Sequence, residues 1–206
     1  MKKKLPVIGL TGNIGSGKST IAELFAKRGL VVINGDDLGK DVVNESQKFR
    51  NWLQNRYGET IFDGENLNRA ALGRIVFSNP VARDDLNENI WPYIRDLIKD
   101  RIEAIHHNSE VPIVDAAMIY EWNDEARYDF IVTVVVDPEI GVSRAAKRMN
   151  LSEDELMKRY EMQVPYQEKA DRSDIVITNN GSIAELHNKF HNAWEQQILP
   201  FLEGFN

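Results

Sequence analysis

The stretch from Gly12 to Ser19 reads GNIGSGKS and carries the groups needed to hold a chain of phosphates. It fits the pattern G-x-x-x-x-G-K-[S/T] at every fixed position. Glycines let the backbone fold tightly around an oxyanion, so that successive N–H groups and a helix N-terminus point at the phosphates. We expect Lys18 to reach the β and γ phosphates of a nucleotide and the Ser19 hydroxyl to ligate Mg²⁺. The predicted nucleotide-binding residues are Gly12, Asn13, Ile14, Gly15, Ser16, Gly17, Lys18, Ser19 and Thr20.

Two further apolar runs lead into carboxylates. The run 30–33 is followed shortly by Asp36 and Asp37, and the run 111–114 ends on Asp115. In open parallel sheets, ligands collect beyond the carboxyl ends of the strands. We therefore expect Asp36 to be functional, whereas Asp37 is equally well explained as a helix cap. Asp115 is expected either to hold the hydration shell of Mg²⁺ or to orient a substrate hydroxyl.

A charged region lies between the last two predicted strands, over residues 144–172. Arg144, Arg148 and Arg159 belong to this stretch, which is typical of a solvated helical face. A polyphosphate-binding protein of net negative charge also needs cations brought in locally, to neutralise charge that moves onto the leaving group. A mobile arginine-bearing lid would supply them and exclude water, so we predict a lid region over residues 144–172.

The elements that must position these residues alternate along the chain. Apolar runs predict five buried strands, at 7–10, 30–33, 111–115, 131–138 and 175–178. The segment after the phosphate loop is a predicted helix, and strand, helix, strand at this spacing indicates parallel pairing. A mostly helical block over residues 38–107 exceeds a simple crossover, which suggests a substrate-covering subdomain whose core includes Trp52, Trp91 and Tyr93. We predict one α/β domain over residues 1–206.

Composition narrows the function classes further. The chain has 206 residues, a formal charge of −7 and no cysteine. The charge argues against a general nucleic-acid binder. The absence of cysteine excludes disulfides and thiolate chemistry and suits a cytoplasmic protein. No apolar run approaches the ~20 residues of a membrane span. The sequence leaves the oligomeric state open.

Taken together, these blocks resemble the dephospho-coenzyme A kinase family. The resemblance runs from Ile8 to about Ser182 and extends beyond the phosphate loop. It includes the segment 32–36, the block 67–77 (LNRAALGRIVF) and the segment 163–181. It implies a phosphate-loop kinase core with a five-stranded parallel sheet, a helical substrate subdomain and an arginine-rich lid. It also implies ATP-dependent phosphorylation of the ribose 3′-hydroxyl of dephospho-coenzyme A, which gives coenzyme A in the last step of that pathway.

The resemblance also implies roles for individual residues. Lys18 matches the phosphate-loop lysine, Asp36 the carboxylate placed against the acceptor hydroxyl, and Arg144 and Arg148 the lid cations, without indicating which arginine carries the transferred charge. Asn180 and Gly181 match positions near the adenine. The implied substrate residues are Thr11, Asp36, Arg69, Asp115, Glu121, Arg159 and Gln163.

The sequence departs from the family pattern at three places. Asn34 stands where the family usually has a first aspartate, Trp91-Pro92 replaces a His-Pro pair, and the segment 115–121 lacks a proline. Two other interpretations therefore stay open, a related kinase for another small hydroxyl compound and a nucleotide-binding module without catalysis. No Asn-Lys-x-Asp motif for reading guanine is present.

Overall fold

The computed structural model describes residues 5–64 and 66–205, with the side chains of Asp36 and Phe77 left undescribed. Two compact units make up the chain. The core unit comprises Met1–Asn34 and Ile102–Asn206, and the helical unit comprises Gly35–Arg101.

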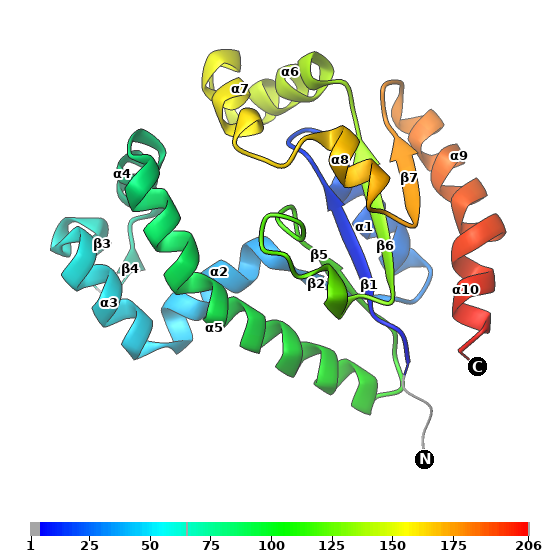
Figure 1. The fold of residues 1–206 in the computed structure, drawn as a ribbon, viewed down its shortest axis with the longest axis horizontal. Coiled ribbons are helices and arrows are strands. Elements are labelled where there is room, and N and C mark those ends of the chain that lie inside the picture. The colour runs from blue at the N-terminus through cyan, green and yellow to red at the C-terminus, as the bar shows by residue number, and fades with distance from the viewer. Residues whose placement is uncertain (1–4, 65, 206) are drawn as a thin grey trace. The chain divides into compact units, whose positions relative to one another are not determined.

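The core unit is built on a five-stranded parallel sheet in the order β2-β5-β1-β6-β7 (Figure 1). The predicted fold class is thereby confirmed. The central strand β1 has neighbours from far along the chain on both sides, as parallel pairing through crossovers requires. The strands are β1 (Ile8–Gly12), β2 (Val31–Asn34), β5 (Pro112–Asp115), β6 (Phe130–Val135) and β7 (Ile175–Thr178).

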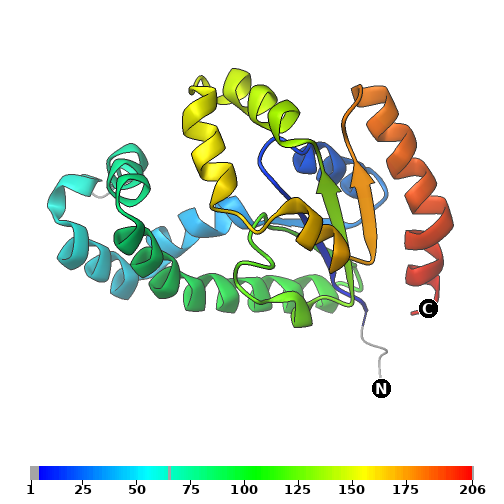
Figure 2. The same cartoon turned by 45° about the horizontal axis from the view of Figure 1, so that its top comes forward.

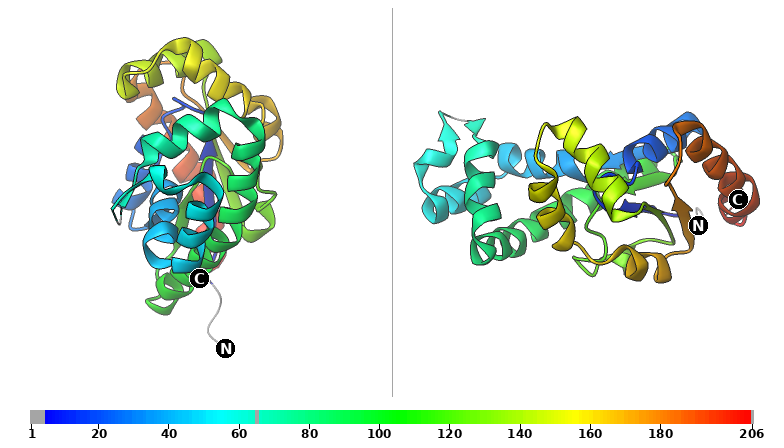
Figure 3. Two further views of the ribbon diagram at one scale, coloured as in Figure 1. Left: turned by 90° about the vertical axis from the view of Figure 1, so that its left-hand side faces the viewer. Right: turned by 90° about the horizontal axis from the view of Figure 1, so that it is seen from above.

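Helices cover both faces of this sheet, which explains why its inner strands are buried along nearly their whole length. In β6, every residue after Phe130 is buried. Helix α1 lies on one face and α8 on the opposite face (Figures 1 and 3). The helices of the core unit are α1 (Lys18–Lys27), α6 (Pro138–Met149), α7 (Glu153–Glu161), α8 (Tyr166–Asp171), α9 (Ile183–Ala193) and α10 (Leu199–Glu203), with one π-helical turn at Trp194–Ile198.

The C-terminal helices complete the core through the apolar stripe that the sequence predicts. Leu186, Phe190, Trp194 and Ile198 are all buried. The Phe190 ring meets Phe25 of α1 edge-on, with 4.9 Å between the ring centroids. Helix α9 is thereby fastened beside α1.

Helices α6 and α7 lie beyond the carboxyl ends of β6 and β7 (Figure 2). Ser152 caps α7, because its Oγ accepts a hydrogen bond from the Glu155 N–H at 3.2 Å. This confirms the predicted helix start. The pair has a small core of its own, made of Val142, Ala145, Ala146, Leu156 and Tyr160.

The helical unit contains α2 (Gly35–Glu45), α3 (Gln47–Tyr57), α4 (Arg69–Ser78) and most of α5 (Pro80–His107) (Figure 3). Asn68 caps α4 as predicted, with its Oδ1 accepting from the Ala71 N–H at 2.9 Å. A two-strand hairpin, β3 (Phe62–Asp63) and β4 (Asn66–Leu67), precedes α4. Its strands have two residues each, too short to leave an alternating pattern in the sequence.

The prediction that Trp52, Trp91 and Tyr93 form the core of the helical unit is wrong in part. All three are only half-buried, whereas Phe49 is 1% exposed. Trp52 stacks on Phe49 with 5.5 Å between centroids, and Tyr93 lies 5.3 Å from the same ring. The larger aromatics therefore cover a phenylalanine, which is the typical arrangement for side chains with a polar end.

None of the helices in the described part of the chain has the length and apolarity needed to cross a bilayer.

Candidate active site

The phosphate loop occupies the predicted position between strand β1 and helix α1. Gly15 and Gly17 have φ angles of 74° and 91°, which side-chain-bearing residues rarely adopt. A Cβ on Gly15 would collide with the Gly141 carbonyl, and one on Gly17 would collide with the Asn179 side-chain amide. Both glycines are thus required by backbone conformation and by close packing.

Helix α1 starts inside the loop and presents its N-terminus there. No side chain caps this end of the helix within the described residues. The Ser16 N–H turns back to the Asn13 carbonyl at 3.1 Å, which closes the loop. The first N–H groups of a helix lack partners within the helix, and the helix dipole favours negative charge at this end. The loop is accordingly shaped to receive an anion.

Lys18 and Asp115 form an ion pair beside this loop. Leu10 of β1 and Asp115 of β5 are register partners, so Asp115 ends its strand just before the loop begins. Its side chain is 5% exposed and that of Lys18 is 15% exposed. The sheet topology therefore brings a carboxylate to the loop lysine, as the strand-end argument predicts.

Asp36 follows the neighbouring strand. Asn34, the last residue of β2, is the register partner of Asp115, and α2 begins at the next residue. Asp36 stands in the first turn of α2, and its side chain lies outside the described residues. Its catalytic role stays a prediction.

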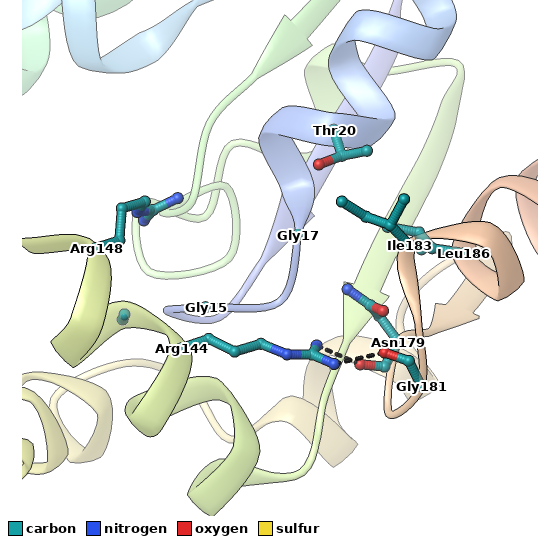
Figure 4. Close-up of a pocket in the computed structure, with 10 residues that line it drawn as sticks. Gly15, Gly17, Thr20, Arg144, Arg148, Asn179, Gly181, Ile183 and Leu186 are labelled. Carbon is teal, nitrogen blue, oxygen red and sulfur yellow. Dashed lines mark hydrogen bonds between the residues drawn. The ribbon is translucent and has the colours of Figure 1, made fainter.

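A pocket of about 340 Å³ opens next to the loop (Figure 4). Gly15, Gly17 and Thr20 form its loop side. Ile183 and Leu186 of α9 give it an apolar wall, and Ile183 is 67% exposed although it is a large aliphatic side chain. An apolar wall beside a phosphate loop suits the flat base of a nucleotide.

Arg144 and Arg148 both line this pocket but have different surroundings. The Arg144 guanidinium donates to the backbone carbonyls of Asn179 at 2.7 Å and Gly181 at 2.6 Å. The exposed Arg148 makes no hydrogen bond or ion pair with another described residue. In Figure 4 the Arg144 side chain points toward Asn179 and Gly181, and the Arg148 side chain lies apart from both of them. Arg148 therefore has all of its donors available to a ligand in this conformation, whereas two of the five donors of Arg144 are engaged by carbonyls.

The loop after β7 is tied to the phosphate loop by a residue that sequence reasoning missed. The Asn179 side-chain amide donates to the Ser16 carbonyl at 2.8 Å, and Asn179 lines the pocket. Of the two predicted neighbours, Gly181 also lines the pocket, while the Asn180 side chain accepts from the Asp137 N–H at 2.9 Å. Asn179 directly follows the last residue of β7, and its place at a strand end was the available signal.

A family model for dephospho-CoA kinase matches residues 6–185. The chain belongs to the dephospho-CoA kinase family. A dephospho-CoA kinase from Syntrophotalea carbinolica is 37% identical over 200 residues, covering 96% of this chain and 94% of that protein. The crystal structure of TT1252 from Thermus thermophilus superposes with a TM-score of 0.79 at 29% identity, covering 95% of this chain and 99% of the other. Dephospho-CoA kinase from Campylobacter jejuni shares the fold, with a TM-score of 0.68, 22% identity and coverage of 96% and 98%.

Three of the residues assigned to substrate by resemblance to dephospho-CoA kinases contact protein atoms here. The buried Thr11 hydroxyl donates to the Ala117 carbonyl at 3.1 Å. The Gln163 side-chain oxygen accepts from the Ile14 N–H at 3.0 Å. Glu121 forms an ion pair with Lys169 at 2.8 Å. Their substrate roles stay predictions, but each side chain already has a place in the framework around the loop.

The remaining two substrate candidates are arginines. Arg159 of α7 donates to Glu155 one turn earlier at 2.6 Å. Arg69 is exposed at the start of α4 and borders an apolar pocket of about 220 Å³ within the helical unit. The bounds 38–107 for a substrate subdomain and 144–172 for a lid also stay predictions for this dephospho-CoA kinase family member.

Proposed function

We propose that this chain transfers the γ-phosphoryl group of ATP to the ribose 3′-hydroxyl of dephospho-CoA, which gives CoA. The single observation that carries the proposal is a complete phosphate loop whose Lys18 is paired with a strand-end carboxylate, Asp115, in a chain of the dephospho-CoA kinase family. The acceptor follows from the family, and the donor from the loop and its pocket.

Catalysis in such a transfer rests on positioning and on neutralising charge, because the transition state is loose. The loop amides and the N-terminus of α1 would hold the phosphates. Lys18 would leave Asp115 to reach the β and γ oxygens when ATP is bound. Asp36 would orient the acceptor hydroxyl and take up its proton.

The residues at the loop also fit a magnesium ion. Mg²⁺ prefers hard oxygen ligands and usually keeps several waters while one or two side chains and the phosphates complete its shell. Ser19 is exposed at the first turn of α1, and Asp115 lies beside Lys18 at the end of β5. We infer that Ser19 would ligate the ion and that Asp115 would hold it through a water. The bound ion would neutralise charge on the phosphate oxygens.

We expect Asp115→Asn to raise the Mg²⁺ concentration that gives half-maximal rate by about tenfold or more. Groups that hydrogen-bond to the direct ligands of a metal typically contribute that much to its affinity. Initial rates measured against Mg²⁺ at fixed ATP give this value. Asp129→Asn is the control, because Asp129 is a carboxylate next to strand β6 that accepts a hydrogen bond from the Val7 N–H and has no proposed role in binding the metal. Unchanged half-saturation in Asp115→Asn would contradict the assignment.

The different surroundings of the two pocket arginines support different roles. We infer that Arg148 contacts the phosphates in the transition state and that Arg144 holds the carbonyls around the base pocket. Arg148→Met should lower kcat by about 10²-fold with little change in the KM for ATP, because it removes an interaction made only in the transition state. Arg144→Met should instead raise the KM for ATP.

Steady-state kinetics at varied ATP separate these outcomes, with Lys147→Met as a control for loss of an exposed charge on the same helix. Equal effects of the two arginine substitutions on kcat would argue against the division of roles.

The test of the function itself is ADP release with ATP and dephospho-CoA, with nucleosides or gluconate as other acceptors, and with no acceptor. Release that requires dephospho-CoA, with a product heavier by one phosphoryl group, is the expected result. Release independent of any acceptor would indicate a hydrolase, and no release would indicate a binding module.

The absence of cysteine also supports a cytoplasmic location.

A further inference from the structure

Lys169 is a lysine without exposed surface, which is unusual for this residue type. Its ammonium forms an ion pair with Glu121 at 2.8 Å and donates to the Ala117 carbonyl at 2.8 Å. The second carboxylate oxygen of Glu121 is buried and has no hydrogen-bond partner among the described residues. The charge of Glu121 is therefore compensated mainly by Lys169.

The pair joins two segments that are distant in sequence. Glu121 belongs to the β5 loop (residues 116–121), and Lys169 to the return segment (residues 163–169) that follows α7. Glu121 adds a second link, because its Oε1 also accepts from the Val164 N–H at 3.0 Å. One carboxylate thus fixes both ends of the return segment.

Both segments in turn hold the phosphate loop and the residue before it. The Asn13 side-chain amide donates to the Val164 carbonyl at 3.2 Å, and the Ile14 N–H donates to the Gln163 side chain at 3.0 Å. On the other side, the Thr11 hydroxyl donates to the Ala117 carbonyl, which also receives Lys169. The ion pair thus binds the Ala117 carbonyl and the Val164 N–H, and these two residues are in turn bonded to Thr11 and Asn13.

Stability alone is a weak reason to bury such a pair. Removing two charges from water costs several kcal/mol per ion, and apolar replacements are often neutral or stabilising. Burial lowers the pKa of Lys169 below its ordinary value, Glu121 opposes this, and the nearby positive charge of Lys18 lowers it further. A directional link to defined backbone groups is something that an apolar pair at these positions would not supply.

We propose that Lys169 and Glu121 are positioning residues for phosphoryl transfer, because their buried ion pair holds the return segment and the β5 loop in the places that shape the phosphate loop. This inference rests on the proposed kinase activity. It assigns Glu121 and Gln163 to the framework of the ATP site in place of direct contact with the acceptor.

The test is ATP affinity and kinetics in Lys169→Met, Glu121→Gln and Gln163→Leu. The first two remove one charge each at nearly unchanged size. Gln163→Leu leaves the ion pair intact and removes only the hydrogen bond between the Ile14 N–H and the Gln163 side chain. We expect kcat/KM for ATP to fall on the order of 10²-fold, as small displacements of reacting groups can cost this much. The KM for dephospho-CoA should change less than about threefold.

Two further readouts separate positioning from simple loss of stability. The Ile14 amide should exchange its hydrogen faster in all three variants, because its acceptor is displaced or removed. Arg127→Met is the matched control, since it breaks a partly buried ion pair with Asp124 in the same unit (2.6 Å, side chains 17% and 11% exposed). It should lower the melting temperature without changing ATP affinity.

ATP affinity should also be measured by calorimetry without acceptor. This measurement tests the role of the ion pair even if dephospho-CoA is not the acceptor, so it is independent of the test of the proposed function. If Lys169→Met does not fold, the result for Gln163→Leu decides whether the proposal holds. The proposal is overturned if folded variants bind ATP and turn over within about threefold of the parent, or if acceptor KM rises as much as the ATP effect.

Discussion

Lys18→Ala should lower kcat by on the order of 10³-fold, since it removes the cation that we propose to contact the transferred phosphoryl group. In the nucleotide-free chain, the same substitution removes the positive charge that Lys18 places beside Asp115, whose side chain is 5% exposed. Loss of the ion-pair partner of a nearly buried carboxylate is costly, so the variant should also be less stable. Single-turnover phosphoryl transfer, followed with labelled ATP, measures the first effect, and thermal unfolding measures the second.

The double variant Lys18→Ala/Asp115→Asn separates these two effects. Removing the negative charge of Asp115 as well should recover part of the stability but not the activity. Lys27→Ala, at the exposed end of α1, controls for loss of a lysine from the same helix. Near-normal turnover in Lys18→Ala would contradict the mechanism, whatever happens to the stability.

Asp36→Asn should lower kcat by about 10²–10⁴-fold, with a smaller effect on the KM for either substrate. Asparagine keeps the size of the side chain but neither bears the negative charge nor accepts the proton of the acceptor hydroxyl. The initial rate of CoA formation at saturating ATP and dephospho-CoA measures the loss.

The neighbouring residue provides a matched control for Asp36. Asp37 is exposed and forms an ion pair with Lys40 one turn later in α2. Asp37→Asn should leave kcat nearly unchanged, because an exposed pair of this kind contributes at most about 1 kcal/mol to stability. Equal losses in the two variants would mean that the start of α2 is needed for folding, and that Asp36 has no special role in the chemistry.

The fold was largely predictable because its determinants are local. Five runs of apolar, often β-branched residues mark the strands, and Asn68 and Ser152 mark helix starts through hydrogen bonds that span only three residues. The hairpin before α4 was not predictable, since two-residue strands carry no periodic signal. Phe49 is buried more deeply than Trp52 and Tyr93. This difference depends on how the helices pack, which a sequence pattern does not specify.

The site was predictable only where a residue's role follows from its place at a strand end or in the loop motif. Lys18 and Asp115 meet for that reason. Arg144 and Arg148 stand one turn apart on α6, and only the position of the carbonyls after β7 distinguishes them. Lys169 lies in a polar stretch of sequence, and its burial depends on Glu121, which lies 48 residues earlier in the chain. Such long-range pairings leave no local trace.

Ile14 occupies a position that the phosphate-loop motif leaves unrestricted, yet its side chain packs against the small core of α6 and α7. Ile14 therefore links the hydrogen-bonded loop to these two helices, and we expect the loop and the helices to open together. If ATP binding orders the loop, it should also stabilise α6 and α7. The two helices are held by only a small cluster of buried side chains, so this added stability should matter to them. We therefore expect nucleotide occupancy to lower how often α6 and α7 open locally.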